Sequence, residues 1–126
     1  MTVARAGRLL FDSAQTLSTQ VGTRSAPAPE RTLVFRSGGL VVDLVLHASG
    51  RRFDYLQGQI VRHRDSEPVS GARVRVDGVE PEATTDEHGQ FAVGARARGD
   101  QQVLRVAAGA DAIVCTIPPE RDTSLR

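Results

Sequence analysis

Residues 84–91, TTDEHGQF, carry side chains that could do chemistry. Asp86 and Glu87 supply two carboxylates and His88 an imidazole, which are groups that bind metal ions, and Asp-x-x-Gly also occurs in nucleotide-binding loops. A β-turn needs much the same residues, because Asp commonly opens a type I turn and Gly89 would supply the left-handed residue that ends it. The stretch is therefore either a binding site or a bend in the chain.

The binding-site interpretations lack further ligands. A calcium loop needs several more oxygen ligands at short spacing, and a zinc site needs three or four His or Cys ligands. His47, His63 and Cys115 lie singly on other expected strands or turns. The sequence has no Gly-Lys-Ser/Thr phosphate loop. We therefore predict a structural turn formed by Asp86 and Gly89, joining two paired strands, and we expect no metal and no other cofactor.

No other residue has the neighbours of a catalytic group. All sixteen basic residues are arginine, which excludes Schiff-base chemistry and other reactions of a lysine amine. Cys115 alternates with Ile113 and Ile117, and this spacing favours a buried thiol over a nucleophile. Ser13 and Ser70 lack any local nucleophile motif. We expect a protein that is not an enzyme.

Composition limits the class of partner. The chain of 126 residues fits one domain, and its net charge of +1 gives no electrostatic argument for nucleic acid or an anionic membrane. Four Phe, one Tyr and no Trp argue against stacking surfaces for sugars or single-stranded nucleic acid. Residues 1–30 contain no signal-peptide core, and no stretch approaches membrane-spanning length. With a single Cys as well, we expect a cytoplasmic protein that binds neither membrane nor nucleic acid.

The elements that would position these residues are short strands. From Arg31 onward, apolar alternation is broken every ten or so residues by Gly, Pro, Asp or Ser, which predicts an all-β sandwich of seven to eight strands over residues 31–117. Alternation places Leu40, Val42, Leu44 and Leu46 on a core face. Residues 1–30 are expected to form an arm, in which RLLFDSA (residues 8–14) offers one possible short strand, followed by a linker that Pro27 and Pro29 keep extended; residues 118–126 are expected to form a flexible tail.

One segment has a family resemblance. LQGQIVRHRDSEPVSGARVRVDGVEPEATTDEHGQFAV resembles the carboxypeptidase regulatory-like family, whose pattern runs Gly-x-Val, then Pro-x-x-Gly-Ala-x-Val, then Thr-x-x-Asp-x-x-Gly-x-Phe. The matching residues are Gly58, Ile60, Pro68, Gly71, Ala72, Val74, Thr84 or Thr85, Asp86, Gly89 and Phe91. Ile60 replaces the usual Val, and ARARGDQQ departs from the usual Pro-Gly turn before the last family strand.

The resemblance implies a transthyretin-like, or prealbumin-like, sandwich of Ig-like type. Such modules are generally not catalytic and are commonly attached to or paired with other proteins. Ring-cleaving dioxygenases that share the sandwich need two Tyr and two His iron ligands, whereas Tyr55 is the only Tyr here. The zinc ligands of the peptidase domain are also absent from the regulatory-like module. The resemblance therefore implies a binding or structural role.

Two groups of outward residues are the candidate interface. Strand alternation places Val41 and Val45 on one outer face, with Phe53 and Tyr55 beside them on the next strand. Either a partner covers this face, or the arm with Leu9, Leu10 and Phe11 folds back over it, or a bulge reverses the register. Arg73 and Arg75 also point outward, but the acidic residues Asp65, Glu67 and Asp77 interrupt the basic charge.

We therefore expect a non-catalytic protein-binding or assembly module, a bacterial intracellular regulatory or complex subunit. It would bind a protein partner or a second copy of itself through an apolar sheet face and open strand edges, because an edge offers unpaired backbone groups. The alternative is a sandwich that binds a small ligand or carbohydrate, against which the sparse aromatic residues count.

Overall fold

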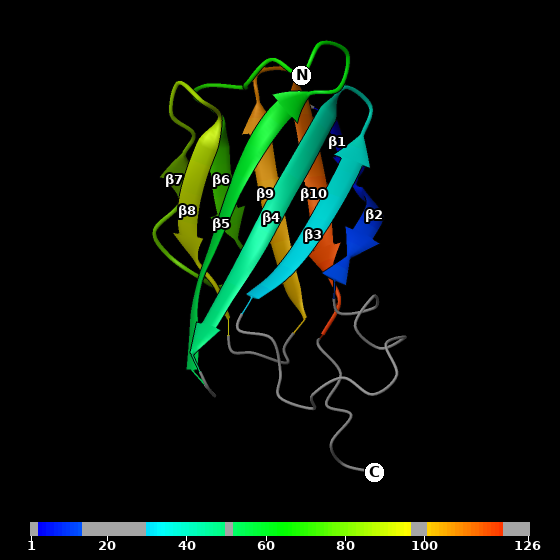
Figure 1. Cartoon of the computed structure of the whole chain (residues 1–126). Helices are drawn as coiled ribbons and strands as arrows, with labels where there is room; N and C mark the ends of the chain where they lie inside the picture. Colours follow the sequence, from blue (N-terminus) through cyan, green and yellow to red (C-terminus); the bar gives the residue numbers. More distant parts are fainter. Residues whose placement is uncertain (1–2, 14–29, 50–51, 97–100, 120–126) are drawn as a thin grey trace.

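The computed structural model describes residues 3–13, 30–49, 52–96 and 101–119, and for residues 3, 48, 49 and 52–54 it describes the backbone alone. Within these described ranges, ten strands form two five-stranded sheets that pack face to face (Figure 1). The strands are β1 (Val3–Ala6), β2 (Arg8–Asp12), β3 (Glu30–Ser37), β4 (Leu40–Ser49), β5 (Arg52–Arg62), β6 (Arg73–Val76), β7 (Ala83–Thr84), β8 (Gln90–Gly94), β9 (Gln102–Ala108) and β10 (Asp111–Ile117). The predicted all-β sandwich is confirmed.

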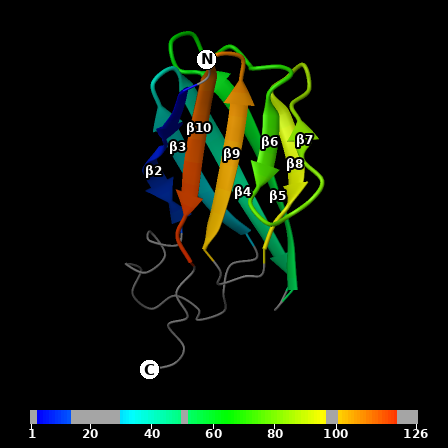
Figure 2. The same cartoon turned by 180° about the vertical axis from the view of Figure 1, so that it is seen from behind.

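The two sheets are built from alternating parts of the chain. We call the sheet with strand order β1-β10-β9-β6-β7 sheet A, and the sheet with order β2-β3-β4-β5-β8 sheet B. Sheet B lies in front in Figure 1, and Figure 2 shows sheet A from the opposite side. All strand pairs are antiparallel except β1 with β10. The long strands β4 and β5 form the centre of sheet B.

The core lies between the sheets and follows the predicted alternation. Leu40, Val42, Leu44 and Leu46 are buried on β4, and Leu56 and Ile60 are buried on β5. Sheet A contributes Val74, Val76, Leu104, Val106, Ile113, Cys115 and Ile117. Phe35 and Leu33 complete the layer from β3. Since alternate side chains of a strand point to opposite faces, the residues between these buried ones must lie on the two outer faces.

The N-terminal segment belongs to the sandwich. Strand β1 pairs in parallel with β10, and β2 pairs antiparallel with β3, so residues 3–12 add an edge strand to each sheet. Gly7 lies at the crossing, where its N–H donates to the carbonyl of Val114 at 2.7 Å and a Cβ would approach the Ile113 side chain to 3.1 Å. Within the predicted arm, β2 forms at the possible short strand of residues 8–14, and residues 3–12 pair with the two sheets instead of standing apart from them. The predicted linker at 14–29 and residues 120–126 of the predicted tail lie outside the described residues.

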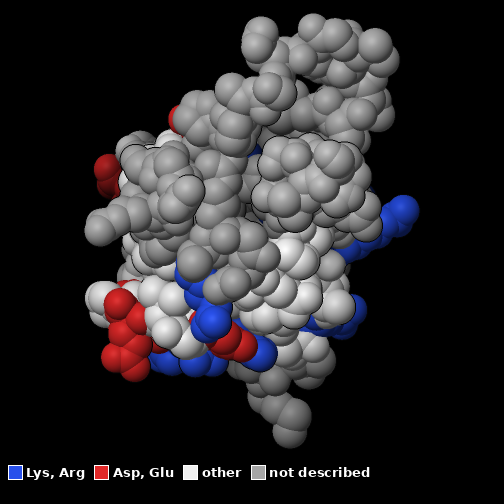
Figure 3. All heavy atoms as spheres, turned by 90° about the horizontal axis from the view of Figure 1, so that it is seen from below, with Lys and Arg blue, Asp and Glu red and all other residues white. Residues whose placement is uncertain are grey.

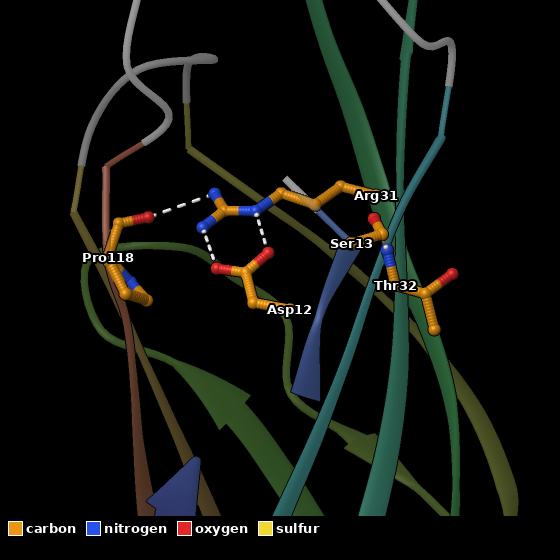
Figure 4. A network of polar contacts seen from close by, with 5 residues as sticks. All are labelled: Asp12, Ser13, Arg31, Thr32 and Pro118. Carbon is orange, nitrogen blue, oxygen red and sulfur yellow. Dashed lines mark hydrogen bonds and ion pairs between the residues drawn. The ribbon is translucent and has the colours of Figure 1, made fainter. Parts of the chain in front are cut away.

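A buried ion pair holds this segment in place (Figure 4). Arg31 on β3 donates through Nε and Nη2 to the two carboxylate oxygens of Asp12, at 2.9 and 2.6 Å. Its remaining Nη1 donates to the carbonyl oxygen of Pro118, at 2.9 Å. The side chains of Arg31 and Asp12 are 8% and 1% exposed. The pair thus joins β2, β3 and the end of β10 in one network.

Candidate interaction surfaces

Residues 86–89 form a closed turn. The carboxylate oxygen Oδ1 of Asp86 accepts hydrogen bonds from the backbone N–H groups of His88 and Gln90, both at 2.9 Å, and the N–H of Gly89 donates to the Asp86 carbonyl. The two bonds to the carboxylate lower the pKa of Asp86, since they favour its charged form. Gly89 has φ +73°, the left-handed conformation that glycine adopts without strain. The carboxylate of Asp86 is thus occupied by the turn itself.

The turn does not close a hairpin. The strands on either side of it were expected to pair with each other, whereas β7 pairs with β6 in sheet A and β8 pairs with β5 in sheet B. That prediction is wrong because the chain crosses from one sheet to the other at this turn. Ile60 on β5 donates its N–H to the Gly89 carbonyl at 2.8 Å, and a Cβ on Gly89 would collide with the Ile60 carbonyl oxygen.

The other residues of the family-like motif have packing roles in the same region. The Thr85 hydroxyl donates to the Val69 carbonyl at 2.7 Å and accepts from the Ala72 N–H at 2.9 Å. Gly58 lies against the Phe91 ring so closely that a Cβ would have to displace it. Of the two candidate threonines, Thr85 makes these buried bonds, while Thr84 is exposed. Each of these side chains or glycines therefore has a structural explanation.

The candidate ligands for a metal do not converge. Among the described residues, no group of three or more His, Cys, Asp or Glu side chains could hold an ion. The ring of His47 stacks on Tyr55 with centroids 4.6 Å apart, and His88 lies on the exposed turn. Cys115 is buried between the sheets, and burial raises its pKa to about 12. The thiol is therefore protonated at physiological pH.

The outer face of sheet B holds one part of the predicted interface. Val41 and Val45 are half-buried on β4, with the exposed Asp43 between them. Partial desolvation by its neighbours on the sheet raises the pKa of the Asp43 carboxyl. Tyr55 on β5 is 41% exposed. Phe53 lies on β5, but its side chain is outside the described part of the structure. The centre of this face is thus less apolar than the alternation of valines predicted.

The largest exposed apolar side chains of the described residues lie beside this face. Leu10 is 51% and Phe11 is 43% exposed, on the edge strand β2. The register between β2 and β3 shifts between Leu9 and Phe11, so the strand bulges there, and Leu9 packs against the core while Phe11 lies opposite Val34. The segment therefore extends sheet B sideways and does not fold back over Val41 and Val45. We call Leu10 and Phe11 the β2 edge patch.

Arg73 and Arg75 lie on the opposite side of the molecule, on the outer face of sheet A. Their neighbours on β9 are Ala107 and Arg105. Arg105 makes a bidentate pair with Asp77 at 2.8 and 2.9 Å, which lowers the pKa of that carboxyl. The nearest ion-pair distances of Arg73 to Glu82 and of Arg75 to Asp77 are 3.5 and 3.7 Å. The structure therefore separates the predicted interface into two surfaces.

A shallow depression of about 230 Å³ lies on the same outer face of sheet A. Its lining includes Ala4, Ala107, Ala112, Val114, Arg73, Arg75, Glu82 and Arg105. At the lower end of the sandwich, arginine and carboxylate groups of the described residues lie side by side (Figure 3). On the outer face of sheet A, the arginines border the depression, and the carboxylates of Glu82 and Asp77 lie among them.

The comparisons with known proteins give no match: neither a family model, nor a curated protein, nor a solved structure matches this chain. Within the described ranges, no helix is long and apolar enough to cross a membrane. The surfaces therefore have to be judged by their own chemistry.

Proposed function

We propose that this chain is a non-catalytic β-sandwich module that binds another protein through the β2 edge patch and the adjoining outer face of sheet B. The observation that carries the proposal is the pair of adjacent large apolar side chains, Leu10 and Phe11, exposed on an edge strand. Full burial of such a side chain stabilises a complex by about 1.5–3 kcal/mol, so covering the exposed half of each contributes roughly 1 kcal/mol. The bound partner would also cover Tyr55 or Val41 if its footprint extends across the face.

The bulge suggests how the partner is held. A bulge interrupts the regular ladder that an added strand would need, and edge bulges disfavour strand addition. Leu10 and Phe11 lie at this bulge. We therefore assign the contact at β2 to side-chain packing. The strand addition expected from the sequence would instead take place at an edge without a bulge, such as that of β8.

The absence of catalysis is part of the same proposal. Its support is that the reactive groups already have structural roles: the Asp86 carboxylate accepts the backbone bonds of its turn, and Cys115 is a protonated core thiol. Among the described residues, every buried side-chain nitrogen or oxygen has a hydrogen-bond partner. A site prepared for a substrate more often leaves polar groups aimed at it.

We also propose membership of the carboxypeptidase regulatory-like family, with its transthyretin-like fold. Support comes from the contacts of the motif residues, since Gly58 packs on Phe91, Gly89 on Ile60, and Thr85 bonds the loop before β6. Fold alone does not specify a partner. The bacterial, cytoplasmic and regulatory setting stays a prediction from the sequence.

The test is affinity purification of the tagged chain from its own host, with Phe11→Glu as the variant. We expect one protein to co-purify in stoichiometric amount with the natural chain and to be lost from Phe11→Glu. The matched control is Ser70→Glu, an exposed residue of the loop between β5 and β6. Equal recovery of the partner with Phe11→Glu, at unchanged folding, would refute the assignment of the patch. Light scattering at rising concentration shows whether the partner is a second copy.

The second candidate is a small-ligand site, and the observation that favours it is the depression on sheet A. Its volume of about 230 Å³ is below the roughly 300–1,000 Å³ of usual ligand pockets, and its lining contains no aromatic side chain. Ligand-observed NMR with mono- and dicarboxylates and simple sugars tests this candidate. Saturable binding that Ala107→Trp abolishes would support it, and no binding at millimolar concentration would exclude it.

A further inference from the structure

The outer face of sheet A combines two kinds of side chain in a fixed order. The strand pairing places Ala4, Ala112, Ala107 and Arg73 in one row across β1, β10, β9 and β6. The next row contains Ala6, Val114, Arg105 and Arg75. Small apolar groups thus cover the β1–β10 half of the face, and arginines stand on the β6 half. This step in side-chain length produces the depression.

The arginines are spaced as the side chains of an extended peptide are spaced. Arg73 and Arg75 are two residues apart on β6 and point to the same face, so their Cα atoms are roughly 6.6 Å apart. Alternate side chains of any extended peptide repeat at the same interval of roughly 6.6 Å. A peptide lying along β6 with acidic groups at alternate positions would therefore present one carboxylate to each arginine.

The arginines also retain capacity to bind anions. Arg73 and Arg75 are 70% and 53% exposed at the side chain, and their contacts with Glu82 and Asp77 are longer than hydrogen bonds. Arg105 uses Nε and Nη2 for Asp77. Three arginines thus share two carboxylates around the depression, leaving a local excess of one positive charge. An approaching carboxylate meets charged donors without having to break a close pair on Arg73 or Arg75.

We propose that this outer face of sheet A binds an extended acidic peptide segment whose two sides face along the sheet, so that carboxylates at alternate positions point to Arg73 and Arg75 and the intervening small apolar residues point to the alanine-lined depression. The segment belongs to a protein partner. The site lies on the opposite sheet from the β2 edge patch, so the two surfaces could be occupied at the same time. This inference goes beyond the proposed function and does not depend on it.

The test is fluorescence anisotropy of a labelled eight-residue peptide that alternates Glu and Ala. We expect saturable binding that weakens with salt, because exposed ion pairs are screened. Arg73→Glu combined with Arg75→Glu should weaken binding about tenfold, since two attractions become repulsions. The matched control is Arg62→Glu combined with Arg64→Glu, which makes the same change of charge at exposed positions near the β5 turn. Equal weakening by the control would overturn the proposal.

The spacing is tested by a peptide of the same composition with the order Glu-Glu-Ala-Ala-Glu-Glu-Ala-Ala, in which no two Glu residues are two positions apart. The alternating peptide should bind about threefold more tightly, because only alternate carboxylates match both arginines. Equal binding of the two peptides, or equal binding of a single-stranded oligonucleotide, would show a general attraction of charge and would contradict the site. Circular dichroism confirms that each variant is folded.

A substitution at Asp77 should strengthen peptide binding, whereas the arginine substitutions weaken it. Asp77→Asn removes the carboxylate that Arg75 and Arg105 share, so the alternating peptide should bind about threefold more tightly. Asp43→Asn makes the same change of charge on the outer face of sheet B, on the opposite side of the molecule, and should leave binding unchanged. Phe11→Glu should also leave it unchanged, which separates this site from the β2 edge patch. Weaker or unchanged binding by Asp77→Asn would contradict the proposal.

Discussion

The two outer faces of the sandwich differ in the chemistry that they present. Sheet B carries half-buried valines with Asp43 among them, and its edge strand exposes Leu10 and Phe11. Sheet A carries alanines beside three arginines around a depression. The buried residues between the sheets hold the two outer faces on opposite sides of the molecule. Substitutions of these buried residues should therefore weaken binding at both surfaces, whereas a substitution on one outer face should weaken binding at that face alone.

The largest loss of stability should come from Asp12→Ala, which removes a buried ion pair. It leaves Arg31 buried without its carboxylate, and breaking such a pair costs about 3–5 kcal/mol. Urea unfolding measures the loss, which should appear together with loss of binding at the β2 edge patch. Glu82→Ala, which removes an exposed pair with Arg73, should cost under about 1 kcal/mol. Similar costs for the two variants would contradict the structural role of the buried pair.

Burial of Cys115 in the core makes the unfolding free energy depend on pH. Its folded pKa is raised to about 12, so the unfolded chain, with an ordinary pKa near 9, loses the thiol proton first as pH rises. The thiol's contribution to stability is complete below about pH 8.5 and should fall by roughly 3 kcal/mol by pH 11, at about 1.4 kcal/mol per pH unit. The measurement is the unfolding free energy of the natural chain minus that of Cys115→Val between pH 8 and 11. A difference that does not change with pH would contradict the burial.

A substitution at Gly89 tests the turn at which the chain crosses from sheet A to sheet B. Gly89→Ala imposes a left-handed residue with a Cβ that collides with the Ile60 carbonyl, so we expect a loss of about 2 kcal/mol or more. Gly109→Ala is the matched control, because Gly109 also has positive φ but a Cβ there meets nothing within 4 Å. Its loss should stay near 1 kcal/mol. Equal losses would mean that the contact of the turn with β5 contributes nothing.

Substitutions of exposed residues on the outer faces should have the smallest effect on stability. Phe11→Ser removes a ring that is about half buried in the folded chain and should lower the unfolding free energy by about 1 kcal/mol. Binding at the β2 edge patch should nevertheless be lost, while binding of the acidic peptide to sheet A should persist. Thermal unfolding and the two binding assays measure this together. Loss of both activities at full stability would show that the faces are not independent.

The sequence predicted which residues point inward, but not which outer face the others share. Alternation correctly buried Leu44 and Val74 and directed Val45 and Arg75 outward. It could not show that Val45 and Arg75 lie on different sheets, because in-and-out periodicity carries no information on sheet membership. That membership is set by long-range pairing, β4 with β5 and β6 with β9.

The dependence on long-range pairing also explains why the sequence did not predict the crossing at the Asp86 turn or the pairing of the N-terminal strands. The residues around Asp86 contain every local signal of a turn, so the turn was predictable, but a turn between sheets and a hairpin turn use the same residues. β1 has only four residues, too few for a period to be visible, and its partner β10 lies at the other end of the chain. The exposed Leu10 and Phe11 depend on the β2 bulge, which has no signal in this sequence.

The central claim is that another protein contacts the β2 edge patch. The most direct measurement places a photocrosslinking amino acid at position 11 or, as control, at the exposed position 87 of the Asp86 turn, and irradiates the chain in host cells. We expect one discrete adduct from position 11, identified by mass spectrometry, and none from position 87. Equal adducts from both positions, or none from position 11 in folded protein, would contradict the claim.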